Sequence, residues 1–224
     1  RAGFLFDMGK RDEAIAEMQD ILRQEVPAED RVKIKVGLAR MQAVNGNLVA
    51  ARALVEEVLA EKSDDVEALK LKAGWLILDD NVGEAITLLR SALEVSPRDA
   101  SVMTLMAQAY ERDGNRDLMR EMLASAVDAS GRAPEESVRY AAFLAADKKL
   151  LPAESVLLEA LRLSPGSLML LVPLGQVYIG MEDWNRAGDV ARQLGQMSDP
   201  AAHSSAEALT AAILYGQKKT AEAL

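Results

Sequence analysis

The apolar positions of the chain recur with a helical spacing. In residues 66–79, Leu69, Ala73 and Leu76 fall at i, i+4 and i+7, which is one face of an α-helix. The same spacing returns in residues 100–112 and in later segments. Short polar breaks separate the segments, and we place them near residues 9–11, 45–47, 80–82, 113–115, 147–149 and 181–183. The pattern predicts an all-α chain of about thirteen helices without a β-sheet.

Small residues recur at a fixed period of 34 residues. One series keeps this step throughout: Ala39, Ala73, Ala107, Ala141 and Gly175. A second series does the same, with one larger member: Ala51, Ala85, Met119, Ala153, Ala187 and Ala221. A small residue is needed where two helices cross closely, because a larger side chain pushes the helix axes apart. The two series therefore predict antiparallel helix pairs stacked as a solenoid.

The repeat also predicts details at the helix ends. Ala14 precedes Ala51 by 37 residues, so we expect a three-residue insertion in the loop around Pro27–Asp30. Because Ala221 continues the second series, we expect the second helix of the last unit to begin shortly before Leu224. We expect side-chain caps on the second helix of a pair from Asn47, Asn81, Asn115 and Asp183. We place Pro134 and Pro152 in first helical turns, where proline is tolerated.

This grid resembles the tetratricopeptide repeat, whose motif has small residues at positions eight and twenty, an aromatic residue at eleven and proline at thirty-two. The matching residues are Gly175, Tyr178 and Ala187 in one unit, and Ala73, Ala85 and Pro97 in another. The resemblance implies one right-handed α-solenoid over residues 1–224, with a partial unit 1–31, units 32–65, 66–99, 100–133, 134–167 and 168–201, and a partial unit 202–224. Neither end resembles a capping repeat, so we expect a piece of a longer array whose ends can self-associate.

The resemblance also implies a binding surface. In the family, the first helices of successive units line a concave groove that binds extended peptides or helices. Carried over by position, the groove residues are Lys33, Arg40, Lys70, Arg112, Val138, Ala142, Met169, Val172, Gln176 and Ile179. The groove is then mildly basic in its N-terminal half and apolar in its C-terminal half, and it suits a ligand with an acidic part and an apolar part. The alternative is that the superhelix turns tightly enough for the apolar residues to pack on neighbouring units.

One well-known subfamily is not expected. Members that bind chaperones pair a lysine at the fifth position of a repeat with an asparagine at the ninth. Here Lys70 occupies the fifth position of its repeat, but Gly74 occupies the ninth, so the resemblance does not extend to chaperone binding.

The composition gives little support to a catalytic or metal-binding function. The chain has no cysteine and one histidine, so it has no disulfide and no set of Cys and His ligands for zinc. His203 lies near Ser204 and Ser205, but neighbours on one helix do not converge on a substrate, and we interpret it as a solvated histidine in a first turn. A net charge of −9 counts against nucleic acid. We therefore expect no catalytic, cofactor or metal site.

The sequence favours a protein–protein interaction scaffold that binds a peptide or helix in the concave groove. The alternative is a non-catalytic repeat arm of a larger enzyme, or of an envelope secretion or polysaccharide-export machine. The uncharged run Leu163–Met181 is long enough to suggest a membrane span, but its prolines, glycines and polar residues favour a buried repeat helix. The Ala/Leu-rich units suggest a bacterial cell-envelope setting, with the cytoplasm as the alternative.

Overall fold

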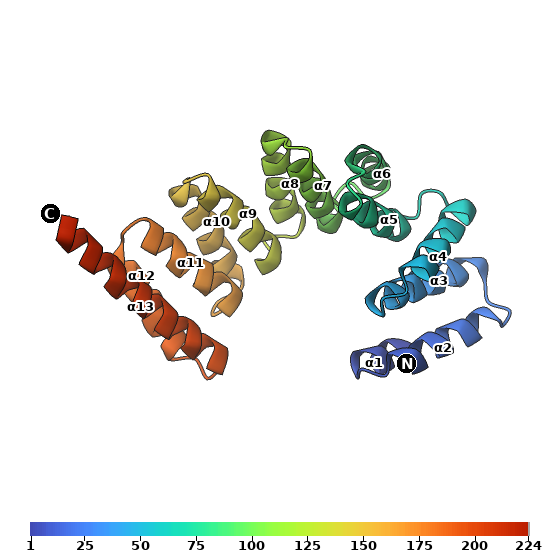
Figure 1. Ribbon diagram of the computed structural model, residues 1–224, viewed down its shortest axis with the longest axis horizontal. Coiled ribbons are helices and arrows are strands. Elements are labelled where there is room, and N and C mark those ends of the chain that lie inside the picture. The colour runs from blue at the N-terminus through green and yellow to red at the C-terminus, as the bar shows by residue number, and fades with distance from the viewer. Residues whose placement is uncertain (224) are drawn as a thin grey trace. The chain divides into compact units, whose positions relative to one another are not determined.

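The computed structural model describes residues 1–223, and the side chains of residues 1–218 (Figure 1). Within that range every regular element is a helix: α1 (Ala2–Asp7), α2 (Arg11–Leu22), α3 (Ala28–Val44), α4 (Leu48–Glu61), α5 (Val66–Leu78), α6 (Val82–Val95), α7 (Ala100–Arg112), α8 (Arg116–Ala129), α9 (Pro134–Ala146), α10 (Leu150–Leu163), α11 (Leu168–Gly180), α12 (Trp184–Gly195) and α13 (Pro200–Ala223). The described chain has no strand, so the all-α prediction is confirmed, and each predicted break separates two helices.

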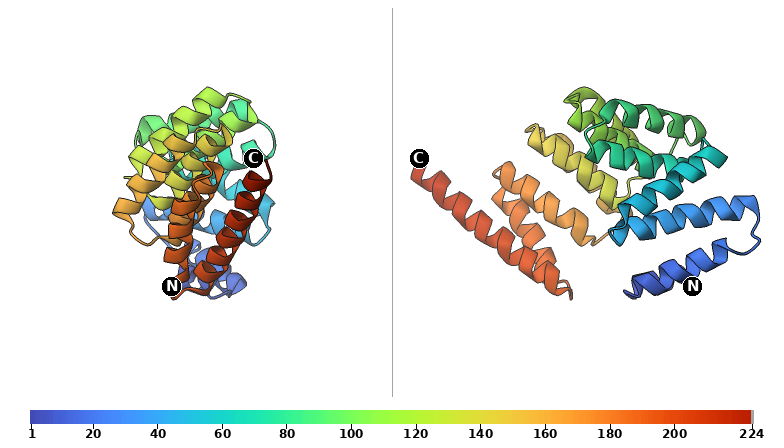
Figure 2. Two further views of the ribbon diagram at one scale, coloured as in Figure 1. Left: turned by 90° about the vertical axis from the view of Figure 1, so that its left-hand side faces the viewer. Right: turned by 45° about the vertical axis from the view of Figure 1, so that its right-hand side comes forward.

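The chain forms two compact units, Arg1–Met119 and the part that begins at Arg120. In the first unit each of the helices α1 to α6 packs on the helix that follows it, and the first helices of successive repeats also contact each other, α3 with α5 and α5 with α7. In the second unit α9, α11 and α13 contact one another in the same way, and α10 and α12 fill the second-helix positions (Figures 1 and 2). Each unit is therefore a helical solenoid of stacked helix pairs.

The two series of small residues lie at the centre of this packing. At most 1% of the surface of these alanines is exposed: Ala39, Ala51, Ala73, Ala85, Ala107, Ala141, Ala153 and Ala187. A Cβ atom on Gly175 would stand 2.6 Å from Cδ1 of Leu209, so α11 and α13 approach closely there. Met119 is half-buried, and the side chain of Ala221 lies outside the described residues. The prediction of buried small residues at the helix crossings is confirmed for Ala107 and Ala141.

The predicted insertion is not a loop. Residues Ala28–Asp30 form the first turn of α3, which has 17 residues where α5 and α7 have 13. Pro27 stands at the N-cap, and Glu29 and Asp30 follow in the first turn. Carboxylates there interact favourably with the helix dipole, which explains why the extra residues lengthen the helix.

The predicted caps are half right. Asp183 accepts a hydrogen bond from the Arg186 amide at 3.0 Å, and Asn115 accepts one from the Leu118 amide at 3.3 Å. The side chains of Asn47 and Asn81 make no cap hydrogen bond. Their amide groups donate to Gln42 and Glu84 instead. The sequence reading missed the caps on the first helices, where Asp65 accepts from the Ala68 amide and Asp99 accepts from the amides of Ser101 and Val102.

The turn inside each helix pair uses a residue with positive φ at one repeat position. These residues have φ between 57° and 86°: Gly46, Asp80, Gly114, Lys148 and Glu182. The next member of this series is Gly216, but α13 runs through it unbroken to Ala223. The expected second helix near Ala221 is therefore wrong. A Cβ atom on Gly216 would collide with the ring of Trp184, so this glycine serves close packing of α13 on α12 rather than a turn.

Candidate functional site

The predicted groove residues all lie on first helices and all remain accessible. The exposed members are Lys33, Arg40, Arg112, Ala142, Met169 and Gln176, and the half-buried members are Lys70, Val138, Val172 and Ile179. They come from α3, α5, α7, α9 and α11. Their chemistry differs between the two units, so each group is described separately.

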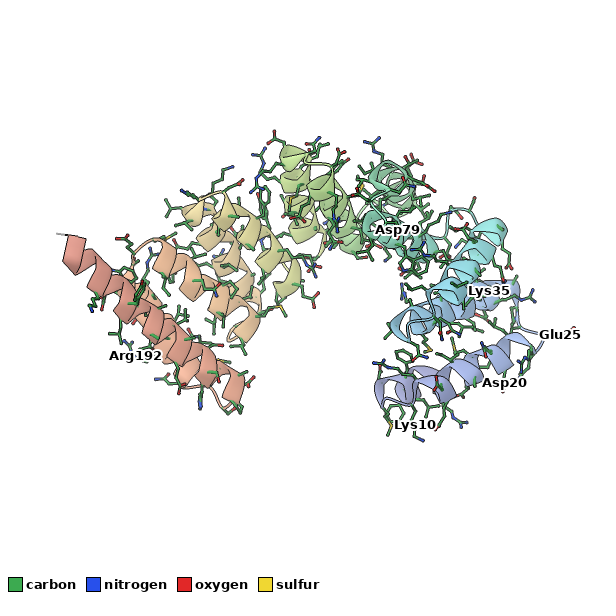
Figure 3. The ribbon with its side chains drawn as sticks, in the orientation of Figure 1. Lys10, Asp20, Glu25, Lys35, Asp79 and Arg192 are labelled. Atoms are coloured by element: carbon green, nitrogen blue, oxygen red, sulfur yellow. The ribbon has the colours of Figure 1, made fainter. Side chains whose placement is uncertain are left out.

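The two basic groove residues of α3 already have carboxylate partners in their own unit. Lys33 Nζ lies 2.9 Å from Glu29 Oε1, one helical turn away. The hydrogen bond to this carboxylate and its charge raise the pKa of Lys33. Arg40 pairs with Glu67 on α5. Lys35, labelled in Figure 3, is paired too, since its ammonium group bonds Glu57 and Glu61 on α4.

Lys70 on α5 lies in a network at the start of α7. Its ammonium group lies 2.6 Å from Glu67 Oε1, 3.2 Å from Asp99 Oδ2 and 2.9 Å from Ser101 Oγ. Burial raises the pKa of Asp99, but hydrogen bonds from the Ser101 hydroxyl, the Val102 amide and Lys70 outweigh burial and hold that pKa below its ordinary value. Lys70 therefore helps to join α5 to the capped end of α7, and its charge is largely neutralised.

The apolar groove residues of the second unit form a pocket between α9 and α11, which we call the α9–α11 pocket. Its volume is about 200 Å³. Its walls include Val138, Ala142 and Ala145 of α9, Pro173, Gln176 and Val177 of α11, and Leu150 of α10. Three predicted groove residues, Val138, Ala142 and Gln176, thus meet at one cavity. Met169, Val172 and Ile179 do not line it.

Sequence reasoning missed Leu150, Pro173 and Val177 because none of them occupies a groove position of the family pattern. Pro173 lies inside α11 and contributes a rigid apolar ring to the pocket wall. A proline in the interior of a predicted helix was a visible signal, since proline there removes a backbone hydrogen bond and is kept only where the surroundings compensate.

The sequence and the fold can now be compared with known proteins. Residues 2–74 match the family model described as a tetratricopeptide repeat. The match covers about a third of the chain, and that part is similar in sequence to tetratricopeptide repeats. No curated protein matches the sequence significantly.

Solved structures with this tetratricopeptide repeat fold cover most of the chain. PilF from Pseudomonas aeruginosa has a TM-score of 0.69 and 15% identity, over 94% of this chain and 93% of PilF. A tetratricopeptide repeat protein from Parabacteroides merdae has a TM-score of 0.65 and 14% identity, over 97% of this chain and 84% of that one. YrrB, described as having an unusual peptide-binding site, has a TM-score of 0.58 and 16% identity, over 82% of this chain and 93% of YrrB. These similarities show a common fold.

Three residues of the last repeat had suggested chemistry, and they make only local contacts in the structure. A ring nitrogen of His203 lies 2.6 Å from the carbonyl oxygen of Met197, and the side chain is exposed. The hydroxyl groups of Ser204 and Ser205 donate to the carbonyl groups of Pro200 and Ala201 in the same helix. These contacts fit the interpretation of a solvated histidine in a first turn.

The uncharged run Leu163–Met181 spans the end of α10, a turn and the repeat helix α11. The apolar residues Leu170, Leu171, Leu174 and Tyr178 of α11 are buried, as expected of a repeat helix. Among the described residues, no helix has both the length and the apolar character required to cross a membrane. The same residues contain no cluster of His, Cys, Asp and Glu that could hold a metal ion.

A partly buried polar cluster between α10, α11 and α12 was not predicted: the side chains of Glu154 and Tyr178 are buried, and those of Asp183 and Arg186 are half-buried. The Arg186 guanidinium lies over the ring of Tyr178, 4.3 Å from its centroid, and pairs with Asp183 and Glu154. The Tyr178 hydroxyl donates to Glu154 at 3.2 Å. Burial, and then the charge of Glu154, raise the pKa of Tyr178. Every polar group of the cluster named here has a partner, which is the condition for burying such groups.

Proposed function

We propose that this chain is a non-catalytic scaffold that binds a segment of a partner protein, with one large apolar side chain of that segment in the α9–α11 pocket. Tetratricopeptide repeat proteins are generally non-catalytic scaffolds, and the fold suggests protein partners. The observation that carries the proposal is the meeting of Val138, Ala142 and Gln176 at one cavity.

The chemistry of the pocket limits the ligand. Most of its wall is apolar, and an unpaired charge placed there would cost several kcal/mol through lost hydration. Gln176 is exposed, and its amide offers both a donor and an acceptor. We therefore infer that the side chain in the pocket is uncharged and that Gln176 bonds the main chain of an extended ligand or a polar side chain of a helical one. YrrB, whose description names a peptide-binding site, supports the proposal only as a protein of the same fold.

A peptide selection with a blocked pocket tests the proposal. Random peptides selected on the whole chain should contain one large apolar residue, and Ala142→Trp should weaken their binding by at least about tenfold, which is ~1.4 kcal/mol. The control is Ala146→Trp, which changes another exposed alanine of the same helix outside the pocket. Binding is measured by titration calorimetry, and circular dichroism checks that both variants fold. Equal losses in the two variants would contradict the assignment to the pocket.

A further inference from the structure

A second cavity opens between the second helices α10 and α12, with α11 as its floor, and we call it the α10–α12 slot. Its volume is about 390 Å³. Its apolar lining includes Leu158 and Leu161 of α10 and Leu171 and Leu174 of α11. None of the predicted groove residues lines it, so the slot is separate from the α9–α11 pocket. α11 packs against both α10 and α12 (Figure 2).

The preceding repeat shows how the corresponding place is covered. Arg132, in the turn after α8, reaches α10, and its Nε lies 2.8 Å from Glu159 Oε2. The residues 34 positions later are Gly166 and Gln193, and both line the α10–α12 slot. The last full repeat has therefore lost both members of the ion pair that bridges the equivalent helices one repeat earlier. The arginine stem and its charge are replaced by a hydrogen atom, and the carboxylate by an amide.

A carboxylate remains at the slot, one helical turn from Gln193. Asp189 takes the position that Ser155 has in the preceding repeat, where the Ser155 hydroxyl lies 3.5 Å from Glu159 Oε1. Asp189 pairs with Arg192, which is labelled in Figure 3, at 2.9 Å. The two side chains are 67% and 69% exposed, and a pair so open to water is worth little. The carboxylate can therefore exchange Arg192 for another cation.

The one cation that lines the slot is already neutralised. Arg186 is held by Asp183 and Glu154 and lies over Tyr178, so it adds little repulsion toward an incoming positive charge. The slot thus combines a leucine-rich floor, an uncovered mouth and an accessible carboxylate and amide at its edge. Within the preceding repeat, the group that meets such an edge is an arginine.

We propose that the α10–α12 slot is a second binding site, for a partner segment that presents apolar side chains next to an arginine. The apolar side chains lie on the leucines of α10 and α11. The arginine stem lies over Gly166, where the preceding repeat has the side chain of Arg132, and its guanidinium bonds Asp189 and the side-chain oxygen of Gln193. The net charge of −9 favours the approach of such a basic segment.

The chain itself suggests the variant that closes the slot. Gly166→Arg together with Gln193→Glu rebuilds the ion pair of the preceding repeat. Gly166 has φ of 75°, but Arg132 holds φ of 64° at the same repeat position, so an arginine is accommodated in this turn. A Cβ atom on Gly166 meets no atom within 4 Å. The double variant should therefore fold, and circular dichroism and the melting temperature check this.

The experiment selects a random-peptide library on the whole chain with Ala142→Trp, so that binders of the α9–α11 pocket are suppressed. Selected peptides should pair apolar residues with arginine. Closing the slot with Gly166→Arg/Gln193→Glu should weaken them at least about tenfold, and Asp189→Asn should weaken them severalfold. The matched control is Asp128→Asn, which removes an exposed carboxylate of α8 that does not line the slot and should leave binding unchanged.

Three results would overturn the proposal. Peptides that bind the closed variant as well as the parent chain would show that the slot is not their site. Peptides without arginine, insensitive to Asp189→Asn, would show that the assigned ligand chemistry is wrong. Self-association of the parent chain in sedimentation, lost in the closed variant, would show that the occupant is a second copy. Because the selection uses Ala142→Trp, each of these results leaves the function proposed for the α9–α11 pocket standing.

Discussion

The first helices of the two units present the same repeat positions with opposite chemistry. On α3 and α5 these positions hold Lys33, Arg40 and Lys70, and each cation is bonded to a carboxylate of its own unit. On α9 and α11 they hold Val138 and Gln176 among small neighbours, and a pocket of about 200 Å³ is left between the helices. The number of charges at groove positions therefore does not show how many of those charges are free to bind a ligand.

The physical reason is that a charged side chain forms an ion pair when the fold places an opposite charge beside it. A ligand carboxylate must compete with Glu67 for Arg40 and with Asp99 for Lys70, so its net gain is small. Small apolar side chains at a groove position cannot fill the space beside them. A ligand that enters the pocket gains the free energy of removing apolar surface from water, and it displaces no protein contact.

The largest expected effect tests the repeat register on which this comparison depends. Ala107 is 1% exposed at a helix crossing of the first unit, whereas Ala142 is exposed on α9 of the second. Ala107→Leu should overpack the crossing and lower the free energy of unfolding by about 1–3 kcal/mol. Ala142→Leu should stay within about 0.5 kcal/mol of the parent. Urea unfolding measures both, and an Ala107→Leu variant with the stability of the parent chain would show that the register is wrong.

A smaller effect tests whether the basic residues of the first unit are structural. Asp99 caps α7 and bonds Lys70, so Asp99→Ala should cost about 1 kcal/mol in unfolding free energy. Asn81 stands at the N-cap of α6 without a cap hydrogen bond, and Asn81→Ala is the matched control with a cost near zero. Urea unfolding of the two variants measures the difference. Equal costs would mean that Asp99 does not hold the start of α7 as the structure indicates.

Asp99 also makes the free energy of unfolding depend on pH, in a direction that follows from its lowered pKa. The pKa of Asp99 is lowered in the folded chain, so its ionised form stabilises the fold above its unfolded pKa of about 3.9, and this contribution is lost as the pH falls through the folded pKa. Asp99→Asn keeps a cap oxygen but has no charge to lose. The stability gap between parent and Asp99→Asn should therefore be widest near neutral pH and should shrink in acid. A gap that stays constant would contradict the lowered pKa.

The sequence was sufficient for the parts of the structure that depend on local sterics. The period of Ala39, Ala73 and Ala107 located the helix crossings because only a small side chain fits there. The partners of Lys70 could not be read in the same way, because Asp99 and Ser101 lie a repeat later and only the stacked helices bring them together. The unbroken α13 was missed because Gly216 fits either a turn or close packing, and Trp184 decides between them.

The difference between repeats that leaves the α10–α12 slot uncovered is visible in the sequence. Comparing each repeat with the next, position by position, would have shown that Arg132 and Glu159 become Gly166 and Gln193. The positions that agree between units define the repeat. The positions that differ show where one repeat leaves uncovered what its neighbour covers.

The smallest expected effect is also the most direct test of the comparison between the units. Arg40 is half exposed and paired with Glu67, and such a pair contributes about 0–1 kcal/mol. Peptides selected on the parent chain should bind Arg40→Ala within about twofold of the parent, in low salt as in high salt, because both sites proposed above lie in the second unit and neither includes Arg40. Titration calorimetry at two salt concentrations measures this, and Arg139→Ala, which changes an exposed arginine on α9, is the matched control. A tenfold loss confined to Arg40→Ala and enlarged in low salt would show that the basic half of the groove binds the ligand after all.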